Sequence, residues 1–459
     1  MANERTVFKG GTVITLIDGE EPRIADVLIE NGKIAQVSQD STPDAEVIDA
    51  TDCIVLPGFV DTHRHVWQTQ LRGVTHDWSL KDYIRSIRFQ AAVHYRAEDM
   101  YVGNYLGMLE AINAGVTTVL DFSHCINTPE HADEAIRGTR ESGIRSLFAL
   151  GLNEVPVQNP AFNTLEHRIE HAKMLREKQF SSNDGLVTMG ISLSDVLVAG
   201  IERVTKEVAI SRELGVRITL HANAVMFPQP VSEVAFLEQA NLLGPDLVWV
   251  HMNQTTDSEL RHVVETGGAI SSTPETEMQM GMGHPVIGRF LAVGGKPSLG
   301  CDVISNNSGC LFSQMRLGLQ MQRMLDNDPE LERHHGPDTI DLSSRTILQA
   351  ATTWGAKAMG LDSKIGTLEA GKEADIIMVR ADDINTMPAN HPIGTITLHA
   401  HPGNVDTVMV AGRILKKDGR LLENRAKLRN QMAESHDHLF HEINATGGLI
   451  PQPPARLPW

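Results

Sequence analysis

The strongest constraint on the fold is a series of short apolar runs that alternate with helical patterns between residues 57 and 360. The eight runs are VLPGFVDTHRH, GVTTVLDFSH, IRSLFALG, GLVTMGISLS, GVRITLHAN, DLVWVHMN, GGAISSTP and KPSLGCDV. They are rich in Val, Ile and Leu without strict alternation, as strands buried on both faces are. Eight βα units are the number that closes a barrel. Polar residues at the carboxyl ends of the runs favour an α/β fold of the (β/α)8 TIM-like type over a doubly wound sheet, because all strand ends of a barrel converge on one face.

The two ends of the chain show a second pattern, of short alternating runs broken by turns. VFKGGTVITL and RIADVLIENGKIAQV lie near the start, and KIGTLEAGKEADIIMV and VDTVMVAGRIL follow the barrel region. Gly-Gly and Asn-Gly turns separate them, which is typical of hairpins. We therefore expect a small β-sandwich domain formed from both chain ends. The expected division is 1–56 and 361–425 for this composite domain, 57–360 for the barrel, and 426–459 for a C-terminal helix and a tail that lies across a neighbouring surface.

Composition limits the kinds of partner that the protein can bind and indicates the compartment in which it works. The net charge of −18 argues against nucleic acid, whose binding requires clustered Lys and Arg, and favours a neutral or cationic small molecule. The apolar runs are all shorter than the roughly 18 residues of a membrane span. The start of the chain lacks the apolar block of a secretory signal, and the four cysteines show no CxxC pairing. These features predict a cytoplasmic protein without a membrane partner.

The segment PGFVDTHRH is the strongest local sign of chemistry. His63 and His65 are two residues apart, so both side chains point to the same side of the first barrel strand and can bind one ion. His221, His251 and Asp302 occupy the corresponding place at the ends of the fifth, sixth and eighth strands. Imidazoles and a carboxylate that converge at one rim form a site suited to zinc, iron or cobalt, with room for water.

With these motifs the sequence resembles the amidohydrolase superfamily, in the branch of triazine chlorohydrolases and of cytosine, guanine and S-adenosylhomocysteine deaminases. The likeness runs from GTVITL through PGFVDTHRH, GVTTVLD and SLGCDVISNN to KIGTLEAGKEADIIMV. It implies that one divalent metal ion, zinc by preference with iron or cobalt as alternatives, is held by His63, His65, His221 and Asp302. It also implies that His251 contacts the bound water or the atom under attack, and that the protein is a homo-oligomer, a dimer or tetramer.

Two departures from the deaminase pattern bear on the reaction. Ala224 stands three residues after His221, where those deaminases have a proton-shuttling glutamate, and Ser192, Ser194 and Asp195 replace a histidine after the fourth strand. Another group must therefore handle the protons. Asp302 can accept the proton of the attacking water. Candidates for the acid that protonates the leaving nitrogen are Glu275 and Glu277 first, then His284 and His124.

Substrate contacts are expected from loops at the same rim. The loop after the first strand resembles the segment that covers the mouth in relatives, and Met residues in EMQMGMG can line an adaptable apolar pocket. The candidates for substrate binding are Trp67, Gln68, Trp78, His124, Asn223, Met280, His284 and Asn306.

The sequence thus predicts a mononuclear metal-dependent amidohydrolase that uses activated water to cleave a C–N bond of the amide, urea or carbamate type in a small cyclic or aryl nitrogen compound. One alternative is a deaminase or chlorohydrolase of an N-heterocycle such as a pyrimidine, purine or triazine. The other, of a different class, is an inactive barrel that acts as an assembly scaffold. Such scaffolds usually lose metal ligands, whereas this chain has all four residues.

Overall fold

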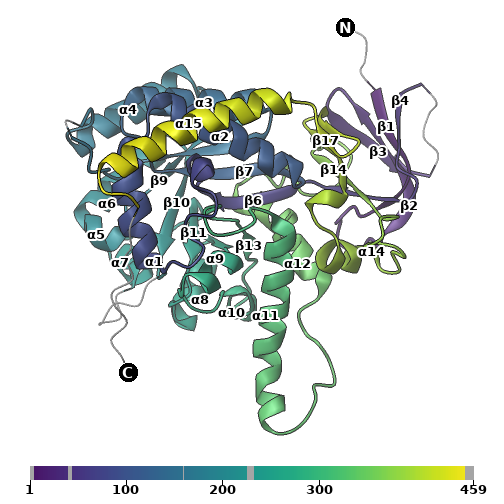
Figure 1. Ribbon diagram of the computed structural model, residues 1–459. Coiled ribbons are helices and arrows are strands. Elements are labelled where there is room, and N and C mark those ends of the chain that lie inside the picture. Colours follow the sequence, from purple (N-terminus) through teal and green to yellow (C-terminus); the bar gives the residue numbers. More distant parts are fainter. Residues whose placement is uncertain (1–4, 40–43, 159, 225–231, 450–459) are drawn as a thin grey trace.

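The barrel predicted from the alternating runs is present in the computed structural model, which describes residues 5–39, 44–158, 160–224 and 232–449. Eight parallel strands of the described chain follow one another in order around it (Figure 1). They are β6 (Phe59–Arg64), β7 (Val116–Ser123), β8 (Arg145–Gly151), β9 (Val187–Ser192), β10 (Arg217–Ala222), β11 (Leu247–His251), β12 (Ala269–Ser272) and β13 (Ser298–Leu299). Nearly every residue of these strands is buried, which explains their continuous apolar character.

The barrel closes between its first and last strands, next to the predicted metal ligands. Arg64 forms a parallel bridge with Asp302, just beyond β13. The backbone N of His65 donates to the carbonyl of Asp302 at 3.0 Å, and the N of Asp302 donates to the carbonyl of His63 at 2.8 Å. Closure of the sheet therefore fixes the distance between residues that are far apart in the sequence.

Helices cover the outside of the barrel, and local sequence sets their ends. Helix α3 (Pro129–Ser142) begins with a proline, whose fixed φ suits the first helical turn, and ends at Gly143, which has φ +78°. Helix α8 (Asp257–Glu265) starts with a capping box between Thr256 and Glu259. The other long helices are α2 (Ala97–Asn113), α4 (Leu165–Lys178), α6 (Ile201–Glu213) and α11 (Leu311–Glu332).

Both chain ends together form one mixed sheet beside the barrel, in agreement with the composite fold predicted from the sequence. Nine strands of the described chain belong to it. They are β1 (Arg5–Val13), β2 (Arg23–Glu30), β3 (Lys33–Ser38), β4 (Glu46–Asp49), β5 (Cys53–Pro57), β14 (Ile376–Arg380), β15 (Val405–Val410), β16 (Arg413–Lys417) and β17 (Arg420–Leu421). The two ends meet where β5 pairs antiparallel with β14, with Pro57 opposite Ile376.

A buried ion-pair cluster joins this sheet to the barrel. Arg145, at the start of β8, donates to both carboxylate oxygens of Asp375 at 2.9 and 3.0 Å, and also pairs with Glu373. The side chains of Arg145 and Asp375 are only 3% and 2% exposed. Asp375 also accepts a hydrogen bond from the backbone N of Ala411. One arginine thus connects a barrel strand to the loop that leads into β14.

The C-terminal helix α15 (Arg425–Ala445) lies across α2, as Figure 1 shows in yellow. Ser435 of this helix donates to Asp99 at 2.7 Å and accepts from Gln70 at 2.9 Å. Gln70 belongs to the 3-10 helix η1 (Val66–Leu71), directly after the His63/His65 pair. The helix therefore supports the segment next to the metal-binding motif. The predicted position of the tail concerns residues 450–459, which lie outside the described residues.

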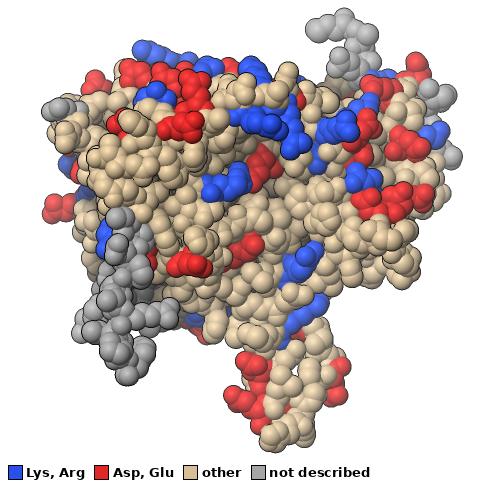
Figure 2. Space-filling model, in the orientation of Figure 1, with Lys and Arg blue, Asp and Glu red and all other residues tan. Residues whose placement is uncertain are grey.

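Charges of both signs are interspersed on the face shown in Figure 2. Helix α11 and the segment after it extend from the body as an arm, and acidic side chains gather at its end (Figures 1 and 2). Among the described residues, none of the helices combines the length and the apolar character that crossing a bilayer requires.

Candidate active site

Four of the predicted ligands meet at the carboxyl ends of the barrel strands. His63 Nε2 lies 3.1 Å from Asp302 Oδ1, and His65 Nε2 lies 3.3 Å from the same oxygen. His221 Nε2 lies 3.3 Å from His65 Nε2. Ligands held tetrahedrally at about 2.0–2.1 Å from one ion lie roughly 3.3 Å from one another. The observed separations therefore fit a single shared cation.

The hydrogen bonds of the histidines also fit a cation. His65 Nδ1 lies 3.0 Å from the carbonyl of Phe122, which can only accept, so Nδ1 carries the proton. His221 Nδ1 faces the carboxylate of Asp195 at 3.5 Å and carries its proton in the same way. The two Nε2 atoms, 3.3 Å apart, therefore both present lone pairs with no proton between them. A positive ion at this point would satisfy both.

The protonation states match the requirements of a divalent ion. Burial lowers the pKa of His63 to about 4, and it lowers the pKa values of His65 and His221 as well. Burial alone would raise the pKa of Asp302, but the hydrogen bond with His63 and the neighbouring imidazoles outweigh it, and the net pKa is below its usual value. Three neutral imidazoles and one carboxylate are a zinc-type donor set.

His251 reaches the same centre from the next strand. Its Nε2 lies 3.9 Å from Asp302 Oδ2, and its Nδ1 lies 3.1 Å from Thr273 Oγ1 and 3.5 Å from Glu277 Oε1. Glu277 is fully buried and accepts from the backbone N of Thr273 at 2.7 Å and from Ser272 at 3.0 Å. Glu277 therefore lies behind His251 and orients its ring.

Three residues of the site have left-handed backbone conformations at the ends of their strands. The φ angles are +48° for Asn223, +75° for His251 and +59° for Asp302. Such conformations are unfavourable for residues with a Cβ and cost about 1–3 kcal/mol each, and they concentrate at functional sites. These unfavourable conformations lower the stability of the fold, and they set the directions in which the three side chains point.

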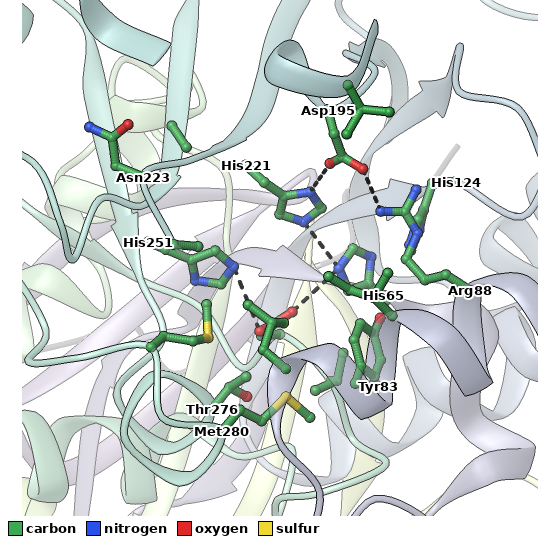
Figure 3. Close-up of a pocket in the computed structure, with 18 of the residues that line it drawn as sticks. His65, Tyr83, Arg88, His124, Asp195, His221, Asn223, His251, Thr276 and Met280 are labelled. Atoms are coloured by element: carbon green, nitrogen blue, oxygen red, sulfur yellow. Dashed lines mark hydrogen bonds and ion pairs between the residues drawn. The ribbon is translucent and has the colours of Figure 1, made fainter. Parts of the chain in front are cut away.

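An ion pair next to His221 was not predicted from the sequence. Asp195, which follows β9, lies between His221 and Arg88 (Figure 3). Arg88 donates to Asp195 Oδ2 at 2.9 Å, and Asp195 Oδ1 faces His221 Nδ1. Arg88 belongs to the π-helical segment η2 (Ile84–Ala91). Arg88 holds the carboxylate in place, and the carboxylate in turn orients the histidine.

A cavity of about 240 Å³ opens directly onto His65, His221, His251 and Asp302. This volume lies just below that of typical ligand pockets, which have about 300–1,000 Å³. Most of the surface area of its lining is apolar. Its apolar residues include Leu80, Ile84, Phe89, Leu197, Met280 and Met282.

Only three of the eight residues predicted to bind substrate line this cavity. His124, Asn223 and Met280 line it. Trp67 and Gln68 are buried and do not line the cavity. Each donates a hydrogen bond to a residue that does, Trp67 to His124 and Gln68 to Tyr83. The remaining three, Trp78, His284 and Asn306, lie outside the lining, and His284 is exposed to solvent.

The two glutamates favoured as the acid also lie outside the lining, so their predicted role needs correction. Glu277 is enclosed behind His251, as described above. Glu275 faces α11, where Gln314 donates to it at 2.8 Å and Ser308 lies 3.4 Å away. Burial raises the pKa of Glu275 to about 7, but the side chain does not face the metal centre. Both residues belong to the helical turn α9 (Pro274–Gln279), which directs Glu275 toward α11 and places Glu277 behind His251, so neither side chain lines the cavity.

The lining contains polar residues that sequence reasoning missed, namely Tyr83, Arg88, Asp195, Glu233 and Thr276. Arg88 and Tyr83 come from the segment after β6, whose π-helical turn has no clear sequence signal. Glu233 is tied to Asn223, whose backbone N donates to its carboxylate at 3.0 Å. The position of Asp195 at the end of the fourth barrel strand was the one signal that could have identified it.

Gly300 provides a test of how tightly the barrel closure holds the ligands. A Cβ at this position would lie 2.8 Å from the Cβ, N and O atoms of His63. We expect Gly300→Ala to displace His63 and to weaken metal affinity by about 10–100-fold, as loss of ligand support usually does. Competitive metal titration measures the change. Gly336→Ala is the matched control because its Cβ would meet nothing within 4 Å; equal affinities of the two variants would contradict the proposed role of the closure.

Comparison with known proteins agrees with this geometry. A model of the Amidohydrolase family matches residues 54–415. The chain belongs to the amidohydrolase family. This confirms the resemblance seen in the sequence and identifies the protein as a hydrolase of that family.

Curated relatives of this amidohydrolase are deaminases of adenosine derivatives. It is 26% identical over 91% of its length to the 5-methylthioadenosine/S-adenosylhomocysteine deaminase of Caldicellulosiruptor saccharolyticus, of which 94% is covered. It is 28% identical over 92% of its length to the enzyme of the same name from Pyrococcus abyssi, of which 96% is covered.

Solved structures confirm the fold of the amidohydrolase. An adenosine deaminase from Xanthomonas campestris with bound zinc superposes with a TM-score of 0.84 at 22% identity, covering 95% of this chain and 98% of that one. A mutant atrazine chlorohydrolase from Arthrobacter aurescens, complexed with zinc and atraton, gives a TM-score of 0.82 at 21% identity, covering 94% and 100%.

Proposed function

We propose that this amidohydrolase binds one divalent cation, zinc by preference, and hydrolyses a C–N bond next to a carbonyl group in a small apolar urea, carbamate or amide. His63, His65, His221 and Asp302 would hold the ion. The observation that carries the proposal is the apolar cavity that opens directly onto this ligand set.

The roles of the residues follow from their positions. A divalent cation lowers the pKa of bound water and polarises a substrate carbonyl. Asp302 is ionised and lies among the ligands, so it can accept a proton from the attacking water and return it to the leaving nitrogen. His251 Nε2 faces Asp302 and is held in that direction by Thr273 and Glu277. Asp195 and Arg88 keep His221 oriented toward the centre.

The cavity favours an apolar substrate over a nucleoside. Ribose hydroxyl groups need hydrogen-bond partners when they are buried. Most of the surface area of the lining is apolar, and among its polar side chains Arg88 is already paired with Asp195. The place of the deaminase glutamate is taken by Ala224, which lines the cavity. An aryl or alkyl group next to a carbonyl fits these surroundings better than a sugar.

Deamination of an N-heterocycle is the second candidate, because the curated relatives are deaminases at 25–28% identity. A two-part substrate panel separates the candidates. Zinc-loaded protein is incubated with N-phenylurea, methyl N-phenylcarbamate and acetanilide, each of which can release aniline, and separately with adenosine, S-adenosylhomocysteine and melamine, which release ammonia. We expect amine release from the first group to exceed ammonia release from the second by at least about tenfold in kcat/KM. Ammonia release from the heterocycles without amine release from the first group would reject the proposal.

A further inference from the structure

The carboxylate of Asp195 offers the cavity a hydrogen-bond acceptor that the roles above do not use. Asp195 follows β9 and lines the cavity, and 41% of its side-chain surface is exposed. Protein atoms nevertheless surround the carboxylate, so this exposed surface belongs to the cavity and not to the outside of the molecule. A molecule that enters the cavity therefore meets this carboxylate directly.

Both oxygens of Asp195 are held in place, and both act as acceptors. Arg88 donates to Oδ2 at 2.9 Å, and the protonated Nδ1 of His221 faces Oδ1 at 3.5 Å. A carboxylate has about four lone-pair sites, so these two neighbours leave about two of them unused. Among the described residues, no further donor is hydrogen-bonded to this carboxylate.

The rest of the lining offers Asp195 few donors. Most of its surface area is apolar, and the side-chain amide of Asn223 already donates to Thr255 at 2.7 Å. Glu233, a second carboxylate of the lining, accepts from the backbone N of Asn223 at 3.0 Å. A carboxylate shielded from bulk water is unfavourable unless donors satisfy it. The cavity thus favours a ligand that brings a donor to Asp195.

Asp195 also lies next to the metal-binding residues. The imidazole ring of His221 alone separates them, because its Nδ1 faces Asp195 while its Nε2 lies 3.3 Å from Nε2 of His65 (Figure 3). A molecule that reaches the metal-binding residues therefore lies beside Asp195.

We propose that Asp195 accepts a hydrogen bond from an N–H group next to the substrate carbonyl, and that it thereby selects substrates that carry such a group. This rests on the proposed function, in which a urea, carbamate or amide is hydrolysed. Hydrogen bonds to an ionised acceptor are about twice as strong as those between neutral groups. The contact transfers no proton. A substrate whose nitrogen carries a methyl group in place of this hydrogen lacks the contact.

The first experiment measures binding without turnover, so it remains informative if the proposed reaction is wrong. Indole has one ring N–H, and benzofuran has nearly the same shape with an oxygen in that place. We expect the zinc-loaded protein to bind indole at least about tenfold more tightly than benzofuran in isothermal titration calorimetry. Equal affinities, or no detectable binding of indole at its solubility limit, would overturn the proposal.

Two variants show whether Asp195 is the acceptor in that experiment. Arg88→Met/Asp195→Leu removes the acceptor without leaving an unpaired guanidinium, and its affinities for indole and benzofuran should agree to within about twofold. Glu233→Gln changes the other carboxylate and should keep the preference for indole. If the double variant keeps the preference, or if Glu233→Gln abolishes it, the acceptor is not Asp195.

The second experiment separates contact with the substrate from orientation of His221. Acetanilide or methyl N-phenylcarbamate, whichever is turned over faster, is compared with its N-methyl analogue in the native protein and in Asp195→Asn. We expect the ratio of the two kcat/KM values to be at least about fivefold smaller in the variant.

A role confined to His221 predicts a different result, because poorer orientation of that ring would lower both kcat/KM values by the same factor. An unchanged ratio in Asp195→Asn would therefore overturn the proposal. If neither compound is turned over, the proposed function fails, and the preference for indole still decides the role of Asp195.

Discussion

Asp302→Asn is expected to lower kcat by roughly 10²–10⁴-fold and to reduce the metal content of the purified protein. Asparagine keeps the shape of the side chain but removes the charge. The carboxylate is the only anionic member of the proposed ligand set, and it is also the group placed to accept a proton from the attacking water. Steady-state kinetics and elemental analysis of the metal measure the two effects separately.

Glu275→Gln is the matched comparison for Asp302→Asn. Glu275 lies in helix α9, directly after barrel strand β12, but its carboxylate faces Gln314 and Ser308. We expect its rate and metal content to stay close to those of the native protein. A loss of rate as large as that of Asp302→Asn, with full metal content, would restore Glu275 as the acid and contradict the geometry described above.

Arg145→Met is expected to lower the free energy of unfolding by about 3–5 kcal/mol, because it leaves the buried carboxylate of Asp375 without its cation. Methionine retains much of the side-chain volume, so the loss reports the charge rather than a cavity. Urea denaturation of the metal-loaded protein measures the change.

Two control variants accompany Arg145→Met. Arg333 pairs with Glu330 at 2.9 Å, but its side chain is 68% exposed, so Arg333→Met should cost less than about 1 kcal/mol. Removing both partners in Arg145→Met/Asp375→Asn should restore part of the stability, since no unpaired charge remains. If the buried and exposed variants lose equal stability, the cluster does not join the sheet to the barrel in the way we infer.

The sequence predicts the barrel and its ligand positions well for a physical reason. Parallel strands that are buried on both faces must be apolar throughout, so a polar residue at the end of each run is conspicuous. His63, His65, His221 and Asp302 each end such a run, and barrel closure brings them together. The family assignment and the fold are confirmed, while the roles of the four residues remain a prediction that the separations of 3.1–3.3 Å support.

The walls of the cavity could not be predicted in the same way. Arg88, which pairs with Asp195, lies in a π-helical segment that continues the short helix α1 (Leu80–Tyr83), and such segments leave no regular period in the sequence. Glu275 and Glu277 were assigned to the rim because they follow a barrel strand closely. The helical turn after β12 instead directs one toward α11 and the other behind His251. The positions of these side chains depend on the conformation of the segments after the strands, and that conformation is set by tertiary packing.

The pairing of β5 with β14 has a consequence for biosynthesis. β5 ends at Pro57, and its partner strand begins only at Ile376. On the ribosome, the first five strands are complete while the barrel is still being made, and the edge of β5 stays without its neighbour during that time. Open edges of this kind promote association between nascent chains. We therefore expect fragments that stop before β14 to aggregate even when they contain all eight barrel strands, and co-expressed chaperones to increase the yield of the full chain.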